Sequence, residues 1–450
     1  MGSKITFNKF ALGYSISSFL ITFGAMNLFQ SIPTKLFIAG VYGIEVVFYL
    51  GIISLLSFIL ALLAPLLGSI SDKRIHVSRR RPFLIFGILG MALVTVLYYF
   101  SPLDFGINDS FLNIIFFVSL QGIYVFSSLT FSITFDSLYP EIFQNLNSRS
   151  TVIALLIGFS ALSSIIRAIL ERFFYIEIIY TGIIFSLLVI LGGIVLFKRG
   201  FDEPYLRILK KPKSNEHSSY KILSSSNKLF KWFLISFFII TFSEILITNA
   251  LSYNWSANIV SIPLSLYEFT TFLLDIIPSV FIIAFVFYWR KLSLSIGIKK
   301  LLKILIITLS LISIVFLFLF DFVSGIIFTT LIKLSLSGLN FVKLLLLAII
   351  IDHHFLNTGK RREATYFGLN HTFNFVSGYI GLLLMSFITV FSVLFVNPFD
   401  PIQTYFLFSK IGLSLFALLF LGISLILIRK IPLDRETYNK IEEEIAEINA

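Results

Sequence analysis

The chain has 450 residues, 57% of them hydrophobic and only 13% charged, whereas soluble domains are about 45–50% apolar and about 25% charged. This composition excludes an ordinary soluble protein and indicates a chain that lies mostly in a lipid bilayer. The net charge of +11 comes mainly from loops between apolar segments, where basic residues set membrane topology, so it does not indicate nucleic-acid binding.

Twelve apolar segments follow one another along the chain. A bilayer core about 30 Å thick needs about 20 apolar residues per helix, and backbone in lipid must form its hydrogen bonds within the helix. The sequence therefore predicts an all-α membrane protein with twelve transmembrane helices. The predicted spans are Phe10–Pro33, Glu45–Leu67, Phe83–Phe100, Phe111–Phe135, Thr151–Leu170, Ile176–Phe197, Phe230–Leu251, Leu266–Tyr288, Leu302–Phe320, Ser324–Ile351, Tyr366–Phe395 and Tyr405–Ile428.

A long hydrophilic stretch, Lys198–Lys228, divides the spans into six and six. Stretches rich in Pro, Ser and charge between apolar segments are typical of linkers. We therefore expect an N-terminal six-helix bundle, a cytoplasmic linker, a C-terminal six-helix bundle and a cytoplasmic tail that forms a short amphipathic helix. Their predicted bounds are residues 1–197, 198–229, 230–428 and 429–450.

Basic residues mark one side of the membrane. All but six of the 35 Lys and Arg residues lie in the two tails, in the loops after spans 2, 4, 6, 8 and 10, or within two residues of those loops. Because Lys and Arg near span ends are retained inside the cell, both termini are predicted to be cytoplasmic, in a multi-pass protein of the cytoplasmic membrane. The six exceptions are Lys35 and Arg172 in opposite loops, and Arg167, Lys333, Lys343 and Lys410 within spans. Lys410 lies near the outer end of span 12, where its side chain could snorkel to the surface.

Polar side chains recur at helical spacing on four spans. Charged and amide side chains are costly in lipid, so such stripes usually line a water-filled cavity or pair with one another. Stripes of Ser, Thr and Gly alone are better explained by close helix packing. The stripes that hold amides, histidine or charge predict a central solute site, and its candidate substrate-binding residues are Gln121, Lys333, Asn340, His371 and Asn374.

Two carboxylates within spans, Glu244 and Asp275, are candidates for carrying a proton. Proton coupling needs a buried group that exchanges its proton between two states of the protein. Asp275 and Lys333 each lie about ten residues, or about 15 Å, from the outer end of their span, so they could pair. Such a pair is either part of the solute site or a structural contact between spans 8 and 10.

Charged motifs follow spans 2, 4 and 10. Carboxylates that face arginines at helix ends can form charge-assisted hydrogen bonds and so hold the ends together on the inner face. These motifs therefore predict a cytoplasmic gate. The predicted gate residues are Gly68, Asp72, Arg79, Arg80 and Arg81 after span 2; Asp136, Glu141 and Arg149 after span 4; and Asp352, Gly359, Arg361, Arg362 and Glu363 after span 10.

The same motifs resemble the signature of the major facilitator superfamily, in the variant found in sucrose-proton symporters and melibiose-type glycoside-pentoside-hexuronide cation symporters. The resemblance covers most of the chain. It implies the major facilitator fold, alternating access, and a substrate bound between two halves with entry coupled to a proton or sodium ion. Span 1 and the interior of span 2 hold no carboxylate, although melibiose-type members carry carboxylates there for sugar and cation, so a proton is the expected ion.

The predicted function is thus secondary active transport of a sugar or glycoside by a proton symporter. The 53 phenylalanines leave open a major facilitator exporter of a drug-like or other hydrophobic solute. We expect no enzyme: Asp352-His353-His354 superficially suggests a metal or acyl-transfer site, but the chain has no cysteine and no further cluster at ligand spacing. We expect no catalytic residue, metal or cofactor, and a monomer whose partners are the solute, a proton and the lipid bilayer.

Overall fold

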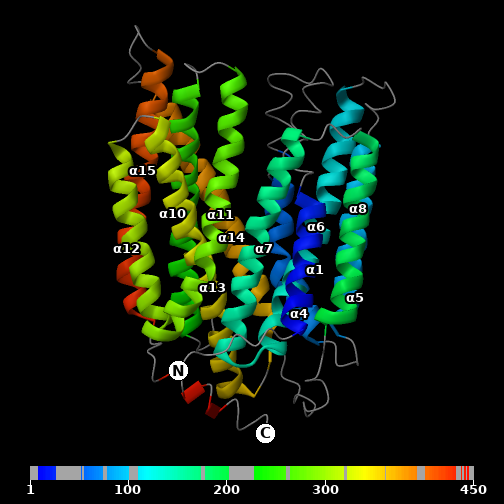
Figure 1. The fold of residues 1–450 in the computed structure, drawn as a ribbon. Helices are drawn as coiled ribbons and strands as arrows, with labels where there is room; N and C mark the ends of the chain where they lie inside the picture. The colour runs from blue at the N-terminus through cyan, green and yellow to red at the C-terminus, as the bar shows by residue number, and fades with distance from the viewer. Residues whose placement is uncertain are drawn as a thin grey trace. The chain divides into compact units, whose positions relative to one another are not determined.

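The computed structural model describes residues 9–26, 52, 55–73, 79–100, 110–173, 178–201, 228–259, 264–318, 322–359, 361–392, 401–431, 437, 440–441 and 443–444. Within these ranges every regular element is helical (Figure 1). Eleven helices there are long and apolar enough to cross a membrane. They correspond to predicted spans 2 to 12, and α1 (Lys9–Met26) lies in predicted span 1. The predicted all-α membrane fold is confirmed, while most of the predicted linker and tail lie outside the described residues.

The helices form two compact units, here called unit 1 and unit 2. Unit 1 comprises Met1–Gln144, Phe173–Tyr220 and Lys360–Thr372. Its described elements are α1, α4 (Ala64–Lys73), α5 (Arg81–Tyr99), α6 (Ser110–Ile142), α8 (Ile178–Val195), the π-helical turn η2 (Leu196–Gly200) and the first turns of α14 (Glu363–Ser392).

Small residues bring the helices of unit 1 close together. In the contact of α1 with α8, a Cβ atom placed on Gly24 would lie 2.6 Å from the backbone oxygen of Phe185. In the contact of α5 with α6, a Cβ atom on Gly90 would lie 2.1 Å from Ser127 Oγ. Close backbone approach through small residues is the usual way in which helices associate in lipid, where no hydrophobic force drives them together.

Unit 2 comprises Asn145–Arg172, Lys221–Gly359 and Phe373–Ala450. Its helices are α7 (Leu146–Phe173), α10 (Lys228–Ile259), α11 (Leu264–Ile296), α12 (Ile298–Leu317), α13 (Phe322–Thr358), the rest of α14, and α15 (Pro401–Arg429). Helix α13 is the centre of this unit. In its apolar 18-residue stretch 78% of the residues are buried, more than in any other candidate span among the described residues. It packs against α10, α11 and α12, and α10 packs against α15.

Each unit contains elements from both halves of the sequence. Unit 1 includes the start of α14, and unit 2 includes α7. The contacts within each unit therefore include contacts between helices of the first six spans and helices of the last six. The expected division into two six-helix bundles stays a prediction.

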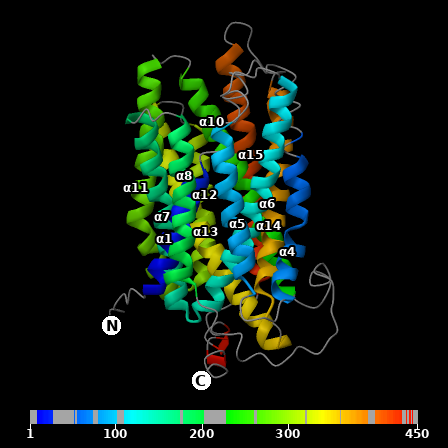
Figure 2. The ribbon, with the colours of Figure 1, turned by 90° about the vertical axis from the view of Figure 1, so that its right-hand side faces the viewer.

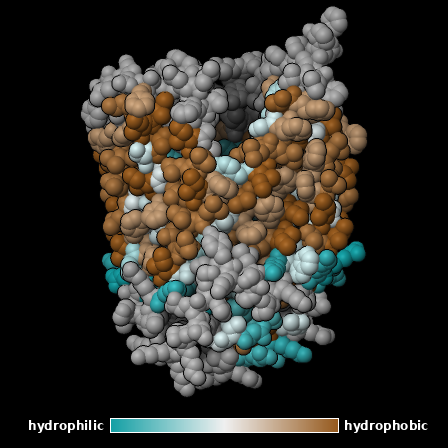
Figure 3. Space-filling model, turned by 180° about the vertical axis from the view of Figure 1, so that it is seen from behind, coloured by the Kyte–Doolittle hydropathy of each residue, from teal (hydrophilic) through white to brown (hydrophobic). Residues whose placement is uncertain are grey.

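Large apolar side chains remain exposed along the helices, as expected for a protein solvated by lipid. Examples are Leu187 on α8 (58% exposed), Leu311 on α12 (59%) and Val390 on α14 (71%). Figure 3 shows apolar side chains covering the middle of the face in view and hydrophilic side chains gathered at its lower end. Exposed apolar surface of this extent is not tolerated by soluble monomers.

The prediction that Lys410 snorkels to the surface is wrong. Its side chain is only 1% exposed, and its Nζ atom donates a hydrogen bond of 2.9 Å to Asn254 Oδ1. The ammonium group also lies 4.2 Å from the centroid of the Phe316 ring. Because a buried ammonium in a span needs an acceptor or an aromatic face, Asn254 and Phe316 hold it inside the helix contact.

Candidate functional site

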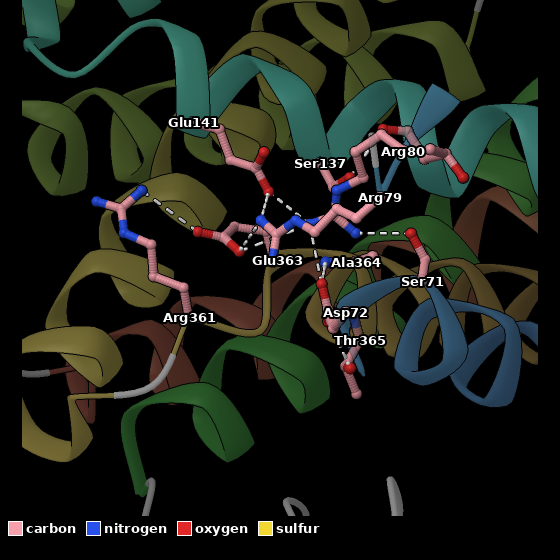
Figure 4. A network of polar contacts seen from close by, with 11 residues as sticks. Ser71, Asp72, Arg79, Arg80, Ser137, Glu141, Arg361, Glu363, Ala364 and Thr365 are labelled. Atoms are coloured by element: carbon pink, nitrogen blue, oxygen red, sulfur yellow. Dashed lines mark hydrogen bonds and ion pairs between the residues drawn. The ribbon is translucent and has the colours of Figure 1, made fainter. Parts of the chain in front are cut away.

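A cluster of arginines and carboxylates joins the ends of α4, α5, α6 and α14 in unit 1. Arg80 lies at its centre and is fully buried. Its Nη2 atom lies 2.9 Å from Asp72 Oδ1 and also contacts the Glu141 carboxylate, while Nη1 donates to Ser71 Oγ at 2.8 Å (Figure 4). We call this group the arginine–carboxylate cluster, and its members are Asp72, Arg79, Arg80, Glu141, Arg361 and Glu363.

The arginine–carboxylate cluster contains three guanidinium groups and three carboxyl groups. Burial alone would lower the pKa of Arg80, but the carboxylates of Glu141, Asp72 and Glu363 raise it above its ordinary value. Arg80 therefore stays charged inside the protein. Removing one partner would leave a buried charge uncompensated, which costs about 3–5 kcal/mol.

Asp72 also caps the first turn of α14. Its Oδ2 atom accepts hydrogen bonds from the backbone N–H of Thr365 at 2.8 Å and from Thr365 Oγ1 at 2.7 Å. Its Oδ1 atom accepts a longer bond, 3.3 Å, from the backbone N–H of Ala364. The first N–H groups of a helix have no partner within the helix and carry partial positive charge, so an aspartate from another helix satisfies both needs.

Two glycines set the register between α4 and α14, which lie close together in Figure 2. A Cβ atom on Gly68 would lie 2.2 Å from the backbone oxygen of Ala364, and one on Gly368 would lie 2.5 Å from that of Ala64. One turn further, Thr372 Oγ1 donates to the backbone oxygen of Ala61 at 2.7 Å. The contact thus extends over three turns, with the Asp72 cap at one end.

A histidine–aspartate pair lies beside the arginine–carboxylate cluster. His371 Nε2 on α14 is 3.1 Å from Asp136 Oδ2 on α6, and the two side chains are 21% and 28% exposed. The ring of Phe367 on α14 packs edge-on against that of Tyr139 on α6, with centroids 5.8 Å apart. Helix α14 is therefore held to α6 by an aromatic contact and a polar contact in addition to the cluster.

In unit 2, α7 is joined to α11 and α13 by a second set of buried polar contacts. Arg149 on α7 forms an ion pair with Asp352 near the end of α13, and both side chains are nearly fully buried. Arg290 on α11 donates from Nε to Thr151 Oγ1 at 2.9 Å and from Nη2 to Asn147 Oδ1 at 2.5 Å. These residues lie at the ends of their helices that are predicted to be cytoplasmic.

Within the spans of unit 2, one polar group joins α10, α13 and α14. Lys343 Nζ donates to Asn374 Oδ1 at 2.6 Å and lies 3.4 Å from Thr241 Oγ1. Glu244, one turn from Thr241 on α10, interacts with Lys343 electrostatically. This Lys343 group, formed by Thr241, Glu244, Lys343 and Asn374, offers hydrogen-bond donors, acceptors and both signs of charge.

A second charged group in unit 2 joins α7, α11 and α13. Asp275 lies between Lys333, with Nζ 3.6 Å from Oδ1, and Arg167, with Nη2 3.7 Å from Oδ2. Lys333 Nζ also donates to the backbone oxygen of Leu274 at 3.0 Å. Pro278 explains that bond: it has no N–H to offer the carbonyl four residues before it, so the Leu274 oxygen accepts from Lys333 instead. We call Arg167, Asp275 and Lys333 the Asp275 group.

Comparison with known proteins identifies the family of the chain. A family model described as the Major Facilitator Superfamily matches residues 14–382. The chain belongs to the major facilitator superfamily. It therefore has the fold of a membrane transporter. No sequence among curated proteins matches it.

Solved structures of major facilitators share the fold at low sequence identity. A human organic anion transporter (TETRAN) matches with a TM-score of 0.69 and 14% identity, over 92% of this chain and 99% of that chain. A bacterial homologue of the iron transporter ferroportin, in an outward-facing state, matches with 0.66 and 15% over 92% and 99%. The fucose:proton symporter of E. coli matches with 0.61 and 13% over 91% and 97%.

The predicted gate residues of this facilitator are distributed as follows. Six form the arginine–carboxylate cluster, Asp136 pairs with His371, and Arg149 pairs with Asp352. Gly359 ends α13 with a backbone φ of 65°, a conformation that favours glycine. Arg81 lies apart from the cluster, with its guanidinium 5.4 Å from the centroid of the Phe197 ring. Arg362 is partly buried beside the cluster member Glu363.

The predicted substrate residues do not form one described group. Lys333 belongs to the Asp275 group, Asn374 to the Lys343 group and His371 to unit 1, while Gln121 is buried on α6 and Asn340 is exposed on α13. Sequence reasoning did not select Arg167 or Lys343 as site residues, although both are charged and lie within spans. The signal for Lys343 was its position three residues after Asn340, on the same helical face.

Proposed function

We propose that this facilitator is a secondary active transporter that moves a sugar or glycoside across the cytoplasmic membrane by alternating access, coupled to protons. The observation that carries the proposal is the arginine–carboxylate cluster. It joins α14, from the last six spans, to α4, α5 and α6, from the first six. We propose that the cluster is a cytoplasmic gate in its closed state, and that Arg149–Asp352 is a separate gate contact within unit 2.

The chemistry of the cluster suits a contact that must be broken and remade. An apolar contact that opens exposes surface to water at about 25 cal/mol per Å². Arginines and carboxylates exchange protein partners for water at a much smaller net cost, because hydration repays most of the lost attraction. The cap on α14 works in the same way, since water can replace Asp72 at the exposed N–H groups.

The Lys343 group supports a polar cargo. Sugars are bound by planar polar side chains and by aromatic rings that stack on their apolar faces. The Asn374 amide and Thr241 hydroxyl lie together on facing helices and supply the planar polar groups. A solved structure with a similar fold is described as a fucose:proton symporter, which supports a sugar as the cargo. Glu244 and Asp275, the two carboxylates that the sequence places within spans, are the proposed proton carriers.

The cargo proposal is tested by uptake into proteoliposomes. The purified protein is first screened for thermal stabilisation by mono- and disaccharides, because a ligand that binds only the folded state raises the melting temperature. Uptake of a labelled disaccharide is then measured with and without an imposed pH gradient. We expect accumulation that needs the gradient. No stabilisation and no uptake by any sugar, together with transport of an organic anion or a hydrophobic drug, would replace the sugar proposal with the exporter alternative.

A matched pair of variants tests whether Asn374 binds the cargo. Asn374→Ala is expected to weaken disaccharide binding about tenfold or more, because it removes an amide from a site built for hydrogen bonds. The control is Asn249→Ala on α10, whose Nδ2 atom bonds to the backbone oxygen of Ile245 in its own helix. It is expected to bind as the parent does. Equal binding by both variants would remove Asn374 from the site.

A further inference from the structure

The His371–Asp136 pair is a polar contact between α6 and α14 that the arginine–carboxylate cluster does not include. On α6, Asp136 precedes the cluster member Glu141 by five residues, and on α14 His371 follows Glu363 by eight. At 1.5 Å per residue these separations are about 8 Å and about 12 Å along the helix axes. The pair therefore lies between the proposed gate and the middle of the membrane. Any movement that separates α14 from α6 at the gate must also separate this pair.

The pair differs from the ion pairs of the gate in its exposure. Arg80 and Asp72 are 0% and 5% exposed, whereas His371 and Asp136 are 21% and 28% exposed. Part of the imidazole surface is therefore accessible while the cluster stays intact. Histidine is also the side chain that most readily gains and loses a proton near neutral pH. Exposure and chemistry together make His371 able to exchange a proton without prior opening of the gate.

We propose that the His371–Asp136 pair couples proton binding to closure of the cytoplasmic gate. When the imidazole carries its second proton, the imidazolium and the Asp136 carboxylate attract each other and hold α14 against α6. When one proton passes from the imidazolium to water, Asp136 stays ionised, the imidazole becomes neutral, and the attraction between the helices falls. The inference rests on the proposed proton-coupled transport and assigns the coupling step to this pair rather than to Glu244 or Asp275.

The other described titratable groups near the pair come from its neighbouring elements. Tyr14 on α1 acts on Asp136 electrostatically, and its hydroxyl is engaged as a donor to the backbone oxygen of Phe135 at 2.7 Å. Tyr139 lies on the same helix as Asp136. The charged groups of the cluster lie further along, on α4, α6, α14 and the segment before α5, and its carboxyl groups, Glu363 on α14 among them, are the other groups whose protonation changes with pH. A His371→Gln variant separates their contribution from that of the pair.

The test uses the natural absence of cysteine and needs no substrate. Ser137→Cys places a thiol on α6 beside the cluster, at a position that is fully buried when the gate is closed. The rate at which a maleimide labels it in the full-length protein reports gate opening. Because maleimide reacts with the thiolate, each rate is divided by that of a second protein carrying Ser295→Cys, an exposed position at the end of α11.

The expected result is a normalised labelling rate that rises about two- to fivefold between about pH 6 and about pH 8, the range expected when a partly exposed ion pair is lost. His371→Gln, added to Ser137→Cys, should remove the rise, and Asp136→Asn should remove it as well. Gel filtration and melting temperature verify that each variant is folded. If one of these two variants does not fold, the other still tests the proposal.

Two results would overturn the proposal. One is a rate that does not change with pH in the parent, and the other is a rise that persists in His371→Gln, which would place the titration in the cluster carboxylates. A failure of the cargo proposal is distinguishable, because labelling needs no sugar. If a sugar is transported, Asp136→Asn should still exchange labelled for unlabelled disaccharide but should lose accumulation driven by a pH gradient. Retained accumulation would also contradict the proposal.

Discussion

Replacing Asp72 with asparagine is the sharpest perturbation of the proposed gate. Asparagine keeps the size and one oxygen of the side chain but loses its charge. Arg80 loses the carboxylate 2.9 Å from its Nη2 atom, and Thr365 loses a charged acceptor for its backbone N–H and hydroxyl. A buried charge left without its partner costs about 3–5 kcal/mol. Since each 1.4 kcal/mol is a factor of ten, the gate should open about a hundredfold or more often.

Hydrogen exchange of the first turn of α14 measures this opening directly. The backbone N–H of Thr365 is protected by Asp72 in the closed state, so its exchange rate follows the population of the open state. Asp72→Asn should raise that rate about a hundredfold, and peptides from the middle of α13 should exchange as before. The control is Ser71→Ala, which removes a neutral acceptor from Arg80 Nη1 but leaves the carboxylates in place, and it should raise the rate only about tenfold. Equal effects of the two variants would refute the reasoning.

Two further predictions concern helix contacts. Gly68→Ala should reduce the free energy of unfolding by about 1–3 kcal/mol and so lower the melting temperature, because its Cβ atom would lie 2.2 Å from the Ala364 backbone oxygen. Gly378→Ala, whose nearest neighbour is 3.6 Å away, should leave the melting temperature unchanged or raise it; the reverse order would contradict the packing described. Arg149→Asp and Asp352→Arg should each destabilise by about 3–5 kcal/mol, while the double exchange should recover at least about half of the loss in a thermal melt. A double variant no better than the worse single one would show that this ion pair contributes little.

The sequence was sufficient to predict the helices and the members of the arginine–carboxylate cluster. Apolar runs of about 20 residues have one stable solution in lipid, so the spans follow from length alone. The cluster residues stand at span ends with opposite charges, and the structure brings Asp72, Arg80 and Glu141 into contact. Their role as a gate remains our proposal.

The sequence did not indicate the partners of side chains within the spans. His371 stands in a polar stripe with Asn374, yet the structure pairs it with Asp136 across to α6, because the register of two helices depends on packing at Gly68 and Gly368. The prediction for Lys410 failed for a similar reason. Its height in the membrane follows from the sequence, but the direction in which its side chain points does not.

The Asp275 group illustrates a contact that depends on backbone chemistry. The predicted approach of Asp275 and Lys333 is present in the structure. The hydrogen bond from Lys333 to the Leu274 oxygen exists because Pro278 leaves that oxygen without its usual donor. A proline four residues after a carbonyl is visible in the sequence. Which side chain from another helix reaches that carbonyl is not.

Locking span 2 to α14 tests the central claim of alternating access most directly. Thr372 Oγ1 lies 2.7 Å from the Ala61 backbone oxygen, so Ala61→Cys combined with Thr372→Cys should form a disulfide in this protein, which has no cysteine of its own. With cross-linking verified by mass, uptake of a labelled disaccharide should stop under oxidation and return on reduction, while each single-cysteine protein transports throughout. Transport that continues at an undiminished rate with the cross-link intact would contradict the account.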